Sequence, residues 1–195
     1  MKDLSLLAAI PLEGPEERAS SFDNAKAGDL AAFELLMRQH ERLVLVTALR
    51  LLGNMADAQD VSQEVFLRLY RNLGKVEASQ ALAGWLYRVT VNACHDLRRR
   101  RPASEPMEYA SAVPAAGADP EASAGETERR RALEMSLRVL SEKERAALVL
   151  RDLEGLSTAE VAKVLGSTEA TVRSHISKGR VKVKSFVERY FRRRM

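Results

Sequence analysis

Apolar residues recur at intervals of three and four along almost the whole of this 195-residue chain. Residues 55–73, MADAQDVSQEVFLRLYRNL, show the pattern well, because one apolar stripe follows them from end to end. The stripe consists of Ala58, Val61, Val65, Leu69 and Leu73. This spacing matches the 3.6-residue period of an α-helix, whereas a strand would alternate with a period of two. We find no convincing alternating segment, so the pattern predicts an all-α fold.

Two short helices with a tight turn between them are predicted near the C-terminus. Ser157 and Glu160 have the spacing of a capping box, in which hydroxyl and carboxylate satisfy free amides at a helix start. Gly166 suits the left-handed residue that ends a helix, and a second helix is expected from Ser167 or Thr168. The apolar side of this second helix carries Val172, Ile176, Gly179 and Val183. The short turn predicts a helix-turn-helix, whose second helix enters the DNA major groove.

The opposite side of the second helix has the composition of a DNA-reading surface. At about 100° per residue, small, hydroxylated and basic side chains point away from the core: Ala170, Thr171, Ser174, Ser177 and Lys178. Basic residues flank them in positions suited to phosphates: Arg173, Arg180, Lys182 and Lys184. An amphipathic helix with a solvated basic face is the alternative. The capping box, the turn glycine and the basic flanks together favour DNA binding.

A supporting pair of helices is expected just before the helix-turn-helix. The first covers roughly Thr127 to Leu140. The second begins with another capping box, formed by Ser141 and Glu144, and closes at Gly155.

A change in composition divides the chain. Residues 102–126 hold four of the six prolines and many Ala, Ser and Gly, with too few large apolar residues to fold alone. We therefore expect two small helical domains joined by a flexible linker, the C-terminal one a helix-turn-helix. The predicted parts are a loose N-terminal arm at 1–21, a first domain at 22–101, the linker at 102–126 and a second domain at 127–195.

Another face of residues 55–73 is acidic, with an apolar residue among its members. Asp57, Asp60 and Glu64 fall together on it, with Gln63 and Leu67 beside them. An acidic helix face is most often simply solvated. An apolar residue among polar neighbours is instead typical of a protein-binding face, and the residues alone leave the two interpretations about equal.

The next predicted helix, LAGWLYRVTVNACHDLRRRR, carries a polar ridge. Arg88, Asn92, His95 and Arg99 follow one another at intervals of four, three and four, and the ridge ends in a basic cluster. Such a ridge suits a nucleic-acid strand, with guanidinium groups on phosphates and the amide free to read a base. Trp85 lies on the buried side and is interpreted as a core residue.

Charge and cysteine content narrow the functional classes. The formal net charge is +4 and the pI about 9.4, and from Arg173 onward Glu188 is the only acid. The single cysteine, Cys94, excludes an intramolecular disulfide, which fits a reducing cytoplasm. No apolar run approaches the ~18 residues of a membrane span, and Cys94-His95 has no partner at metal-ligand spacing. We expect a cytoplasmic protein without metal, cofactor or enzymatic activity.

These segments together resemble the extracytoplasmic-function (ECF) sigma factors, the two-domain promoter-specificity subunits of bacterial RNA polymerase. DAQDVSQEVFLRLYRNL resembles region 2.2 of that family, and GWLYRVTVNACHDLRRR resembles regions 2.3 and 2.4. LSEKERAALVLRDLEGLSTAEVAKVLGSTEATVRSHISKGR resembles region 4, so the resemblance covers about residues 22–185. The three motifs in this order, with a linker between, are strongly specific. Ser141 stands where the family often has proline, and His175 where a basic residue is common.

The resemblance implies a partner for each polar face. The acidic face would bind the clamp helices of the polymerase β′ subunit through Asp57, Asp60, Gln63, Glu64 and Leu67. The loop at 74–80 and the ridge would capture the minus-10 promoter element as single-stranded DNA through Lys75, Arg88, Asn92, His95 and Arg99. The helix-turn-helix would read the minus-35 element as duplex through Thr168, Thr171, Arg173, Ser174, His175, Ser177, Lys178 and Arg180. The polymerase β flap and a dedicated anti-sigma factor are further expected partners, and the free protein is expected to be a monomer.

Two other functional classes predict different behaviour. A helix-turn-helix regulator without a sigma role would bind a palindromic duplex tightly in the absence of polymerase, whereas a sigma factor needs the core enzyme. A nuclease would need metal ligands or an acid–base pair. Asp57, Asp60 and Glu64 could be proposed as ligands, but they share one helix with no histidine near in sequence. We therefore predict a sigma factor.

Overall fold

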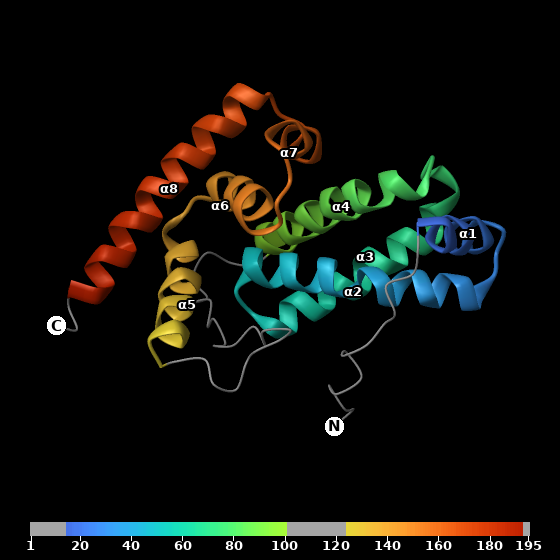
Figure 1. The fold of residues 1–195 in the computed structure, drawn as a ribbon, viewed down its shortest axis with the longest axis horizontal. Coiled ribbons are helices and arrows are strands. Elements are labelled where there is room, and N and C mark those ends of the chain that lie inside the picture. Colours follow the sequence, from blue (N-terminus) through green and yellow to red (C-terminus); the bar gives the residue numbers. More distant parts are fainter. Residues whose placement is uncertain (1–14, 101–123, 193–195) are drawn as a thin grey trace.

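The computed structural model describes residues 15–100 and 124–192, and these residues form helices with no strand among them. The all-α prediction is therefore confirmed. Most of the predicted linker and N-terminal arm lies outside the described residues. Two groups of helices follow each other along the long axis of the molecule (Figure 1).

The first group contains four α-helices and one short 3-10 helix. They are α1 (Pro15–Lys26), α2 (Leu30–Leu52), α3 (Met55–Asn72), η2 (Leu73–Lys75) and α4 (Ser79–Arg100). Gly53 ends α2 with a left-handed φ of 77°, and the Asn54 side chain then caps α3 by accepting a hydrogen bond from the amide of Asp57. Helix α1 overlaps the last residues of the predicted loose arm, so the exact domain boundaries remain a prediction.

The apolar stripe predicted in residues 55–73 is the core side of α3. All five of its members are buried: Ala58, Val61, Val65, Leu69 and Leu73. They pack in one cluster with buried side chains of the neighbouring helices, among them Phe22, Leu52, Leu82 and Leu86. Trp85 is half-buried and packs against the same cluster, in agreement with its interpretation as a core residue.

The second group contains the remaining helices. They are α5 (Ala124–Ser136), η3 (Leu137–Val139), α6 (Glu142–Leu148), η4 (Val149–Leu153), α7 (Thr158–Leu165) and α8 (Glu169–Arg192). Both predicted capping boxes are present, one at the start of α6 and one at the start of α7. The segment predicted as one helix up to Gly155 is less regular than expected, because α6 passes into a π-helical turn at η4.

Helix α8 passes close to α6 at Gly179. A Cβ atom at this position would lie 3.1 Å from Cδ1 of Leu148, so an alanine here would require the leucine side chain to shift by a few tenths of an ångström. Helix α8 continues to Arg192, where α5 covers it and the Tyr190 hydroxyl donates to Glu128 at 2.6 Å. The predicted recognition helix is thus the first part of a longer helix.

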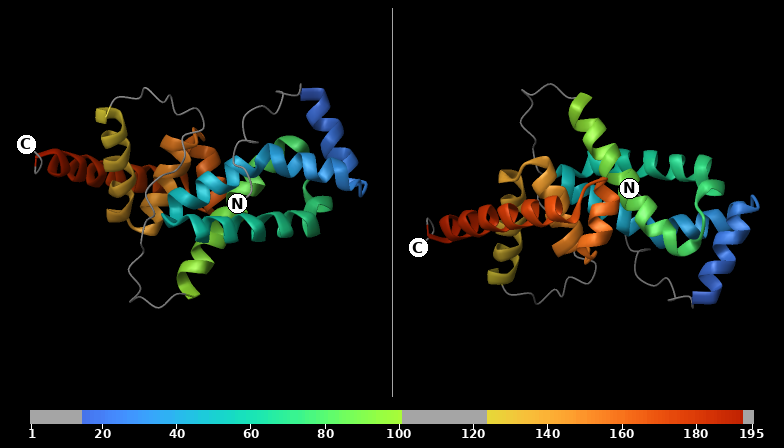
Figure 2. Two further views of the ribbon diagram at one scale, coloured as in Figure 1. Left: turned by 90° about the horizontal axis from the view of Figure 1, so that it is seen from below. Right: turned by 90° about the horizontal axis from the view of Figure 1, so that it is seen from above.

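The two groups pack against each other. Helices α6 and α7 lie over the C-terminal part of α4 in Figure 1, and the two views of Figure 2 show the second group beside the end of α2. The main apolar cluster runs through both groups, since Leu137, Leu140 and Leu148 join it. A smaller cluster contains Tyr87 of α4 together with buried residues of α7 and α8. The described chain therefore has a continuous core.

Candidate polymerase and nucleic-acid interfaces

The helix-turn-helix has the geometry that the sequence predicted. Gly166 ends α7 in the left-handed conformation with a φ of 59°, and the turn reaches α8 within residues 166–168. Thr168 then caps α8, because its hydroxyl oxygen accepts a hydrogen bond from the amide of Thr171 at 3.2 Å. The facing sides of the two helices are buried through Val161, Ala162, Val172 and Ile176.

The outer face of α8 presents most of the residues predicted to read duplex DNA. The exposed ones are Thr168, Thr171, Arg173, Ser174, Ser177, Lys178 and Arg180, and His175 is half-buried. Arg180 is held within the second group, since its guanidinium donates to both carboxylate oxygens of Asp152 at 2.6 and 2.8 Å. Arg173 pairs with Glu169 one turn earlier at 3.1 Å. The face is basic and rich in hydroxyl groups, which suits phosphates and base edges.

The acidic face of α3 is open to solvent around Leu67. Asp60 and Gln63 are exposed, and Leu67 itself is 44% exposed. Glu64 is half-buried and accepts a hydrogen bond from Arg68 at 2.7 Å. An exposed leucine beside acidic and amide side chains is the arrangement expected of a protein-binding face.

The prediction that Asp57 shares this open face is not supported by its position. Its side chain is only 4% exposed, in the first turn of α3. Its charge acts on the nearby Cys94 thiol of α4, which places the carboxylate on the inner side of the helix. The residue spacing alone put Asp57 in line with Asp60 and Glu64, but the packing of α4 against α3 covers it.

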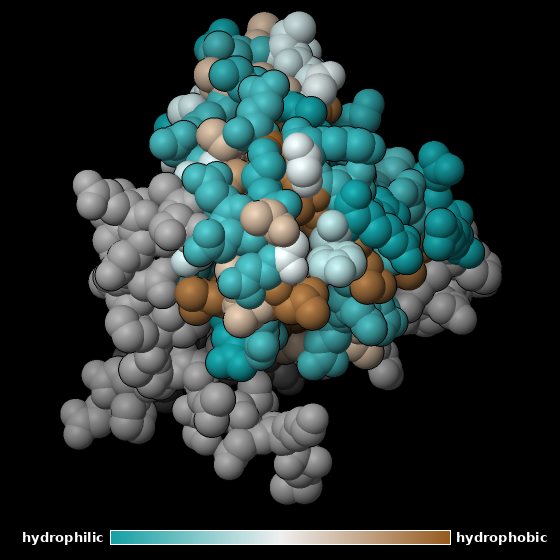
Figure 3. Space-filling model, turned by 90° about the vertical axis from the view of Figure 1, so that its right-hand side faces the viewer, coloured by the Kyte–Doolittle hydropathy of each residue, from teal (hydrophilic) through white to brown (hydrophobic). Residues whose placement is uncertain are grey.

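Tyr70 extends the apolar part of this face, and another exposed apolar residue, Leu30, lies on the neighbouring helix α2. Tyr70 lies one turn after Leu67 and is 58% exposed, and Leu30 at the start of α2 is 67% exposed. The Tyr70 ring contacts Phe33 edge-on, with centroids 5.1 Å apart. This end of the molecule faces the viewer in Figure 3, where apolar patches lie between polar ones. Sequence reasoning passed over Tyr70, although its spacing from Leu67 places both on one side of α3.

The polar ridge of α4 is exposed, and two of its four residues contact the second group. The Arg88 guanidinium donates to the backbone oxygen of Lys163 in α7 at 2.8 Å. His95 Nε2 lies 3.1 Å from a carboxylate oxygen of Glu142 at the start of α6. All four ridge residues remain exposed, and Lys75 lies apart from the ridge in η2, where it is also exposed. The structure thus brings three predicted minus-10 residues, Arg88, Asn92 and His95, to the boundary with the second group.

A cavity of about 360 Å³ lies at this boundary. Asn92 and His95 line it from α4, and Thr171 and His175 line it from α8. Residues predicted to bind two different DNA elements therefore line the same cavity.

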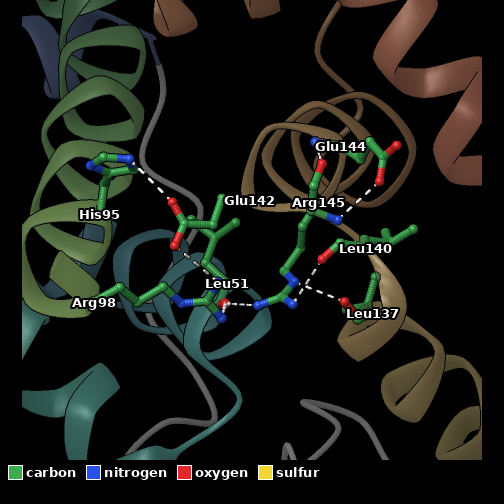
Figure 4. Close-up of polar contacts among 9 residues, drawn as sticks. Leu51, His95, Arg98, Leu137, Leu140, Glu142, Glu144 and Arg145 are labelled. Atoms are coloured by element: carbon green, nitrogen blue, oxygen red, sulfur yellow. Dashed lines mark hydrogen bonds and ion pairs between the residues drawn. The ribbon is translucent and has the colours of Figure 1, made fainter. Parts of the chain in front are cut away.

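The boundary is held by charged residues that sequence reasoning missed. Arg145 of α6 is 5% exposed and donates to the backbone oxygens of Leu137, Leu140 and Leu51 at 2.8, 3.2 and 2.9 Å. Figure 4 shows it pointing from α6 toward the end of α2, where Arg98 of α4 also donates to Leu51. Two guanidinium groups thus meet the carbonyl end of α2, where the helix dipole favours positive charge. The sequence feature that could have indicated this role is a single arginine, Arg145, directly before the apolar run AALVL.

A second charged contact lies near the end of η4. Glu154 accepts hydrogen bonds from Arg50 of α2 at 2.7 Å and from the Tyr87 hydroxyl of α4 at 3.2 Å. Burial, together with the Glu154 carboxylate, raises the pKa of Tyr87 above its usual value, so the hydroxyl stays protonated and donates.

The described residues contain neither a candidate metal site nor a candidate membrane span. No group of three or more His, Cys, Asp and Glu side chains in them could hold a metal ion. None of the helices in this part of the chain combines the length and apolar character that a membrane span requires.

Comparison with known proteins identifies the family of this chain. The family model for Sigma-70 region 2 matches residues 36–103, and the model for Sigma-70, region 4 matches residues 130–183. The chain is 36% identical over 170 residues to ECF RNA polymerase sigma factor SigE of Mycolicibacterium smegmatis, covering 84% of this chain and 65% of that protein. It is 32% identical over 177 residues to ECF RNA polymerase sigma factor SigM of Mycobacterium tuberculosis, covering 90% of this chain and 88% of that protein.

A solved structure shares the fold. It is the sigma factor RpoE in complex with the anti-sigma factor NepR from Bartonella quintana, with a TM-score of 0.66 and 18% sequence identity. The match covers 80% of this chain and 96% of that one. The resemblance drawn from the sequence motifs is thereby confirmed: the chain belongs to the ECF sigma factors, which direct RNA polymerase to promoters.

Proposed function

We propose that this sigma factor uses three separate surfaces in transcription initiation. The open face of α3 binds core polymerase, the ridge of α4 holds the minus-10 element as a single strand, and the outer face of α8 reads the minus-35 duplex. The observation that carries the proposal is the helix-turn-helix, whose inner side is buried while small and basic side chains cover its outer side. The predicted domains at 22–101 and 127–195 would each contribute their own DNA contact.

The residues proposed to bind polymerase are those of the predicted set on α3 whose side chains are not buried. Asp60, Gln63, Glu64 and Leu67 form it, and Tyr70 extends its apolar part. Asp57 is left out because its side chain is buried. The β′ clamp helices are the proposed partner, with the leucine as the desolvated centre and the acids as the polar rim.

The minus-10 set remains the one that the sequence predicted: Lys75, Arg88, Asn92, His95 and Arg99. Cationic groups on one helix edge can track a phosphate backbone, and an exposed amide between them can hydrogen-bond a base. Asn92 provides this amide on α4, because it comes four residues after Arg88 and three before His95.

The minus-35 set lies on α8. Thr171, Ser174 and Lys178 lie on its outer side at helical spacing and are proposed to approach base edges, with Thr168, His175 and Ser177 beside them. Arg173 and Arg180 are proposed to meet phosphates on the two flanks.

Further partners are proposed from the family and from the shared fold. We propose that the second group contacts the β flap of polymerase, that an anti-sigma factor sequesters the chain, and that the free chain is a cytoplasmic monomer. The solved sigma–anti-sigma complex with the same fold supports a partner of this kind.

Run-off transcription with purified core polymerase on genomic promoter fragments tests the function. Promoter-specific transcripts that appear only when the full chain is added are expected. Tight, specific binding to a palindromic duplex without polymerase, together with no promoter-specific transcripts, would instead indicate a regulator of the ordinary helix-turn-helix kind.

A further inference from the structure

A lysine of α1 holds the backbone of the segment that joins α3 to α4. Lys26, the last residue of α1, donates a hydrogen bond from Nζ to the backbone oxygen of Val76 at 2.9 Å. Val76 follows η2 directly and lies in the loop at 74–80, whose Lys75 belongs to the proposed minus-10 set. We propose that Lys26 is a positioning residue, which fixes the conformation of this loop and so sets the bases that the loop accepts. The inference rests on the minus-10 role proposed for the loop.

The loop has a buried side and an open side. Leu73 and Val76 are buried and belong to the main apolar cluster, so they anchor it to the first group. Gly74, Lys75 and Glu77 are exposed. A Cβ atom at Gly74 would meet no atom within 4 Å, so this side of the loop faces open space. An unstacked base of a single strand can reach such a surface without displacing any core residue.

The backbone of the loop depends on support from outside. The single 3-10 turn of η2 is closed by a hydrogen bond from the amide of Val76 to the oxygen of Leu73 at 3.1 Å. Such turns have poorer hydrogen-bond geometry than an α-helix. Val76 itself is extended, so its carbonyl group leaves the turn and accepts its hydrogen bond from Lys26 instead. A bond from a charged donor is stronger than a neutral one, and here it fixes the point at which the chain turns toward α4.

Lys26 is itself held in place, although its side chain is exposed. Its Nζ lies 5.5 Å from the centroid of the Phe22 ring one turn earlier in α1, within the range of cation–π attraction. Phe22 is 1% exposed and packs in the same cluster as Leu73 and Val76. Helix α1 contacts both η2 and α4 at one end of the molecule (Figure 1). The ammonium group therefore has a defined position beside the loop, unlike a lysine on a solvated helix face.

A direct phosphate contact is the alternative role for Lys26, and it predicts a different result. Loss of a phosphate contact weakens binding about equally on all sequences and reduces the salt slope by roughly one. A change in the loop instead alters the fit of individual bases, so it changes the relative use of different minus-10 sequences. The sequence dependence of the effect therefore distinguishes positioning from direct contact.

The experiment is a promoter-library transcription assay with core polymerase and the full chain carrying Lys26→Met or Lys26→Arg. Methionine keeps the unbranched apolar stem and removes the donor. We expect Lys26→Met to change the relative use of minus-10 sequences by about threefold or more, without changing minus-35 preference or co-purification with polymerase. Lys26→Arg should return the preference toward wild type, because a guanidinium can donate to the same oxygen. Lys163→Met is the matched control, since it removes another exposed lysine side chain and leaves the backbone oxygen that binds Arg88.

Hydrogen exchange of the free chain gives a second readout, which needs neither DNA nor polymerase. The amides of residues 74–78 should exchange about threefold faster or more in Lys26→Met, because local opening of the loop costs less free energy without the lysine. The amides in the centre of α3 should keep their wild-type rates. Circular dichroism and thermal unfolding confirm that the variants are folded.

Substitutions in the loop separate failure of this inference from failure of the proposed function. Lys75→Ala and Gly74→Ala alter the exposed side of the loop directly. If neither changes minus-10 preference, the loop does not read this element, and the inference fails together with the proposed role. If they change it while Lys26→Met keeps the wild-type preference, the loop reads DNA but Lys26 does not position it. An equal loss on all minus-10 sequences with a reduced salt slope would make Lys26 a phosphate contact and would also overturn the inference.

Discussion

Helices α3 and α4 lie side by side and each carries a polar face suggestive of binding, but the two faces meet different surroundings. The face of α3 around Leu67 is open to solvent, whereas the ridge of α4, whose residues are also exposed, contacts α6 and α7 through Arg88 and His95. We therefore expect a partner to reach the face of α3 directly, whereas a DNA strand on the ridge of α4 would have to replace the contacts of Arg88 and His95.

The largest loss of polymerase binding is expected when an acid and the central leucine of the open face are both replaced by residues of the wrong charge. In the double variant Asp60→Lys with Leu67→Asp, we expect at least a tenfold loss of affinity for core polymerase. Misplaced charges across an interface cost several kcal/mol, and the desolvated apolar centre is lost as well. Co-purification with core polymerase measures this effect. Gln59→Lys is the control, since it adds charge to another exposed position of the same helix. Unchanged binding of the double variant would show that the face is merely solvated.

Substitutions on the ridge of α4 are expected to have a smaller effect. Asn92→Ala removes hydrogen bonds to a base, which are worth about 0.5–1.5 kcal/mol net, so transcription should fall by roughly two- to tenfold. The loss should depend on the minus-10 sequence, and it should leave minus-35 duplex binding unchanged. A promoter-library transcription assay beside duplex binding separates the two. Lys178→Ala is the complementary variant, expected to change minus-35 preference. A reversed pattern would mean that the two DNA elements are assigned to the wrong halves.

Local features of this comparison were predictable from the sequence, and the contacts of the ridge with the second group were not. Capping boxes at Ser141 and Ser157, and the buried stripe of α3, depend on residues close in sequence, and all three are present. The burial of Asp57 and the contacts of Arg145 and Glu154 depend on residues far apart in sequence. No periodicity within one helix reports which other helix will cover it.

A smaller effect is expected at Arg180, which is exposed but held by Asp152. Asp152→Asn weakens this ion pair and frees the guanidinium for phosphate. Because exposed pairs contribute about 0–1 kcal/mol, duplex affinity should rise by no more than about fivefold, equally on all sequences. Arg180→Ala should lower affinity on all sequences and reduce the salt slope by roughly one. Salt titrations of duplex binding measure both variants. A sequence-dependent change at Arg180 would move this residue from the flank to the base-reading set.

The smallest expected effect concerns the two capping boxes. The glutamate of the box at the start of α6 is buried, and that of the box at the start of α7 is exposed. Hydrogen bonds from Lys182, and from the backbone of Ser141, hold the pKa of Glu144 below its ordinary value. A carboxyl whose pKa is lowered by folding stabilises the folded state above its unfolded pKa, near 4.5, and this contribution is lost as pH falls through the folded pKa. Glu144→Gln should therefore lower stability by about 1 kcal/mol at pH 7, and its difference from wild type should shrink in acid.

The matched variant is Glu160→Gln, at the capping box of α7. Glu160 is exposed, whereas Glu144 is buried and bound by Lys182 of α8 at 2.7 and 2.9 Å. Solvent screens the exposed carboxylate, so we expect Glu160→Gln to have the smaller effect and the weaker pH dependence. Thermal unfolding of both variants between pH 3 and 7 measures the difference. Equal losses at pH 7 would show that the burial of α6 adds nothing to its cap, and would weaken the view that this helix is stabilised by being held between the two halves.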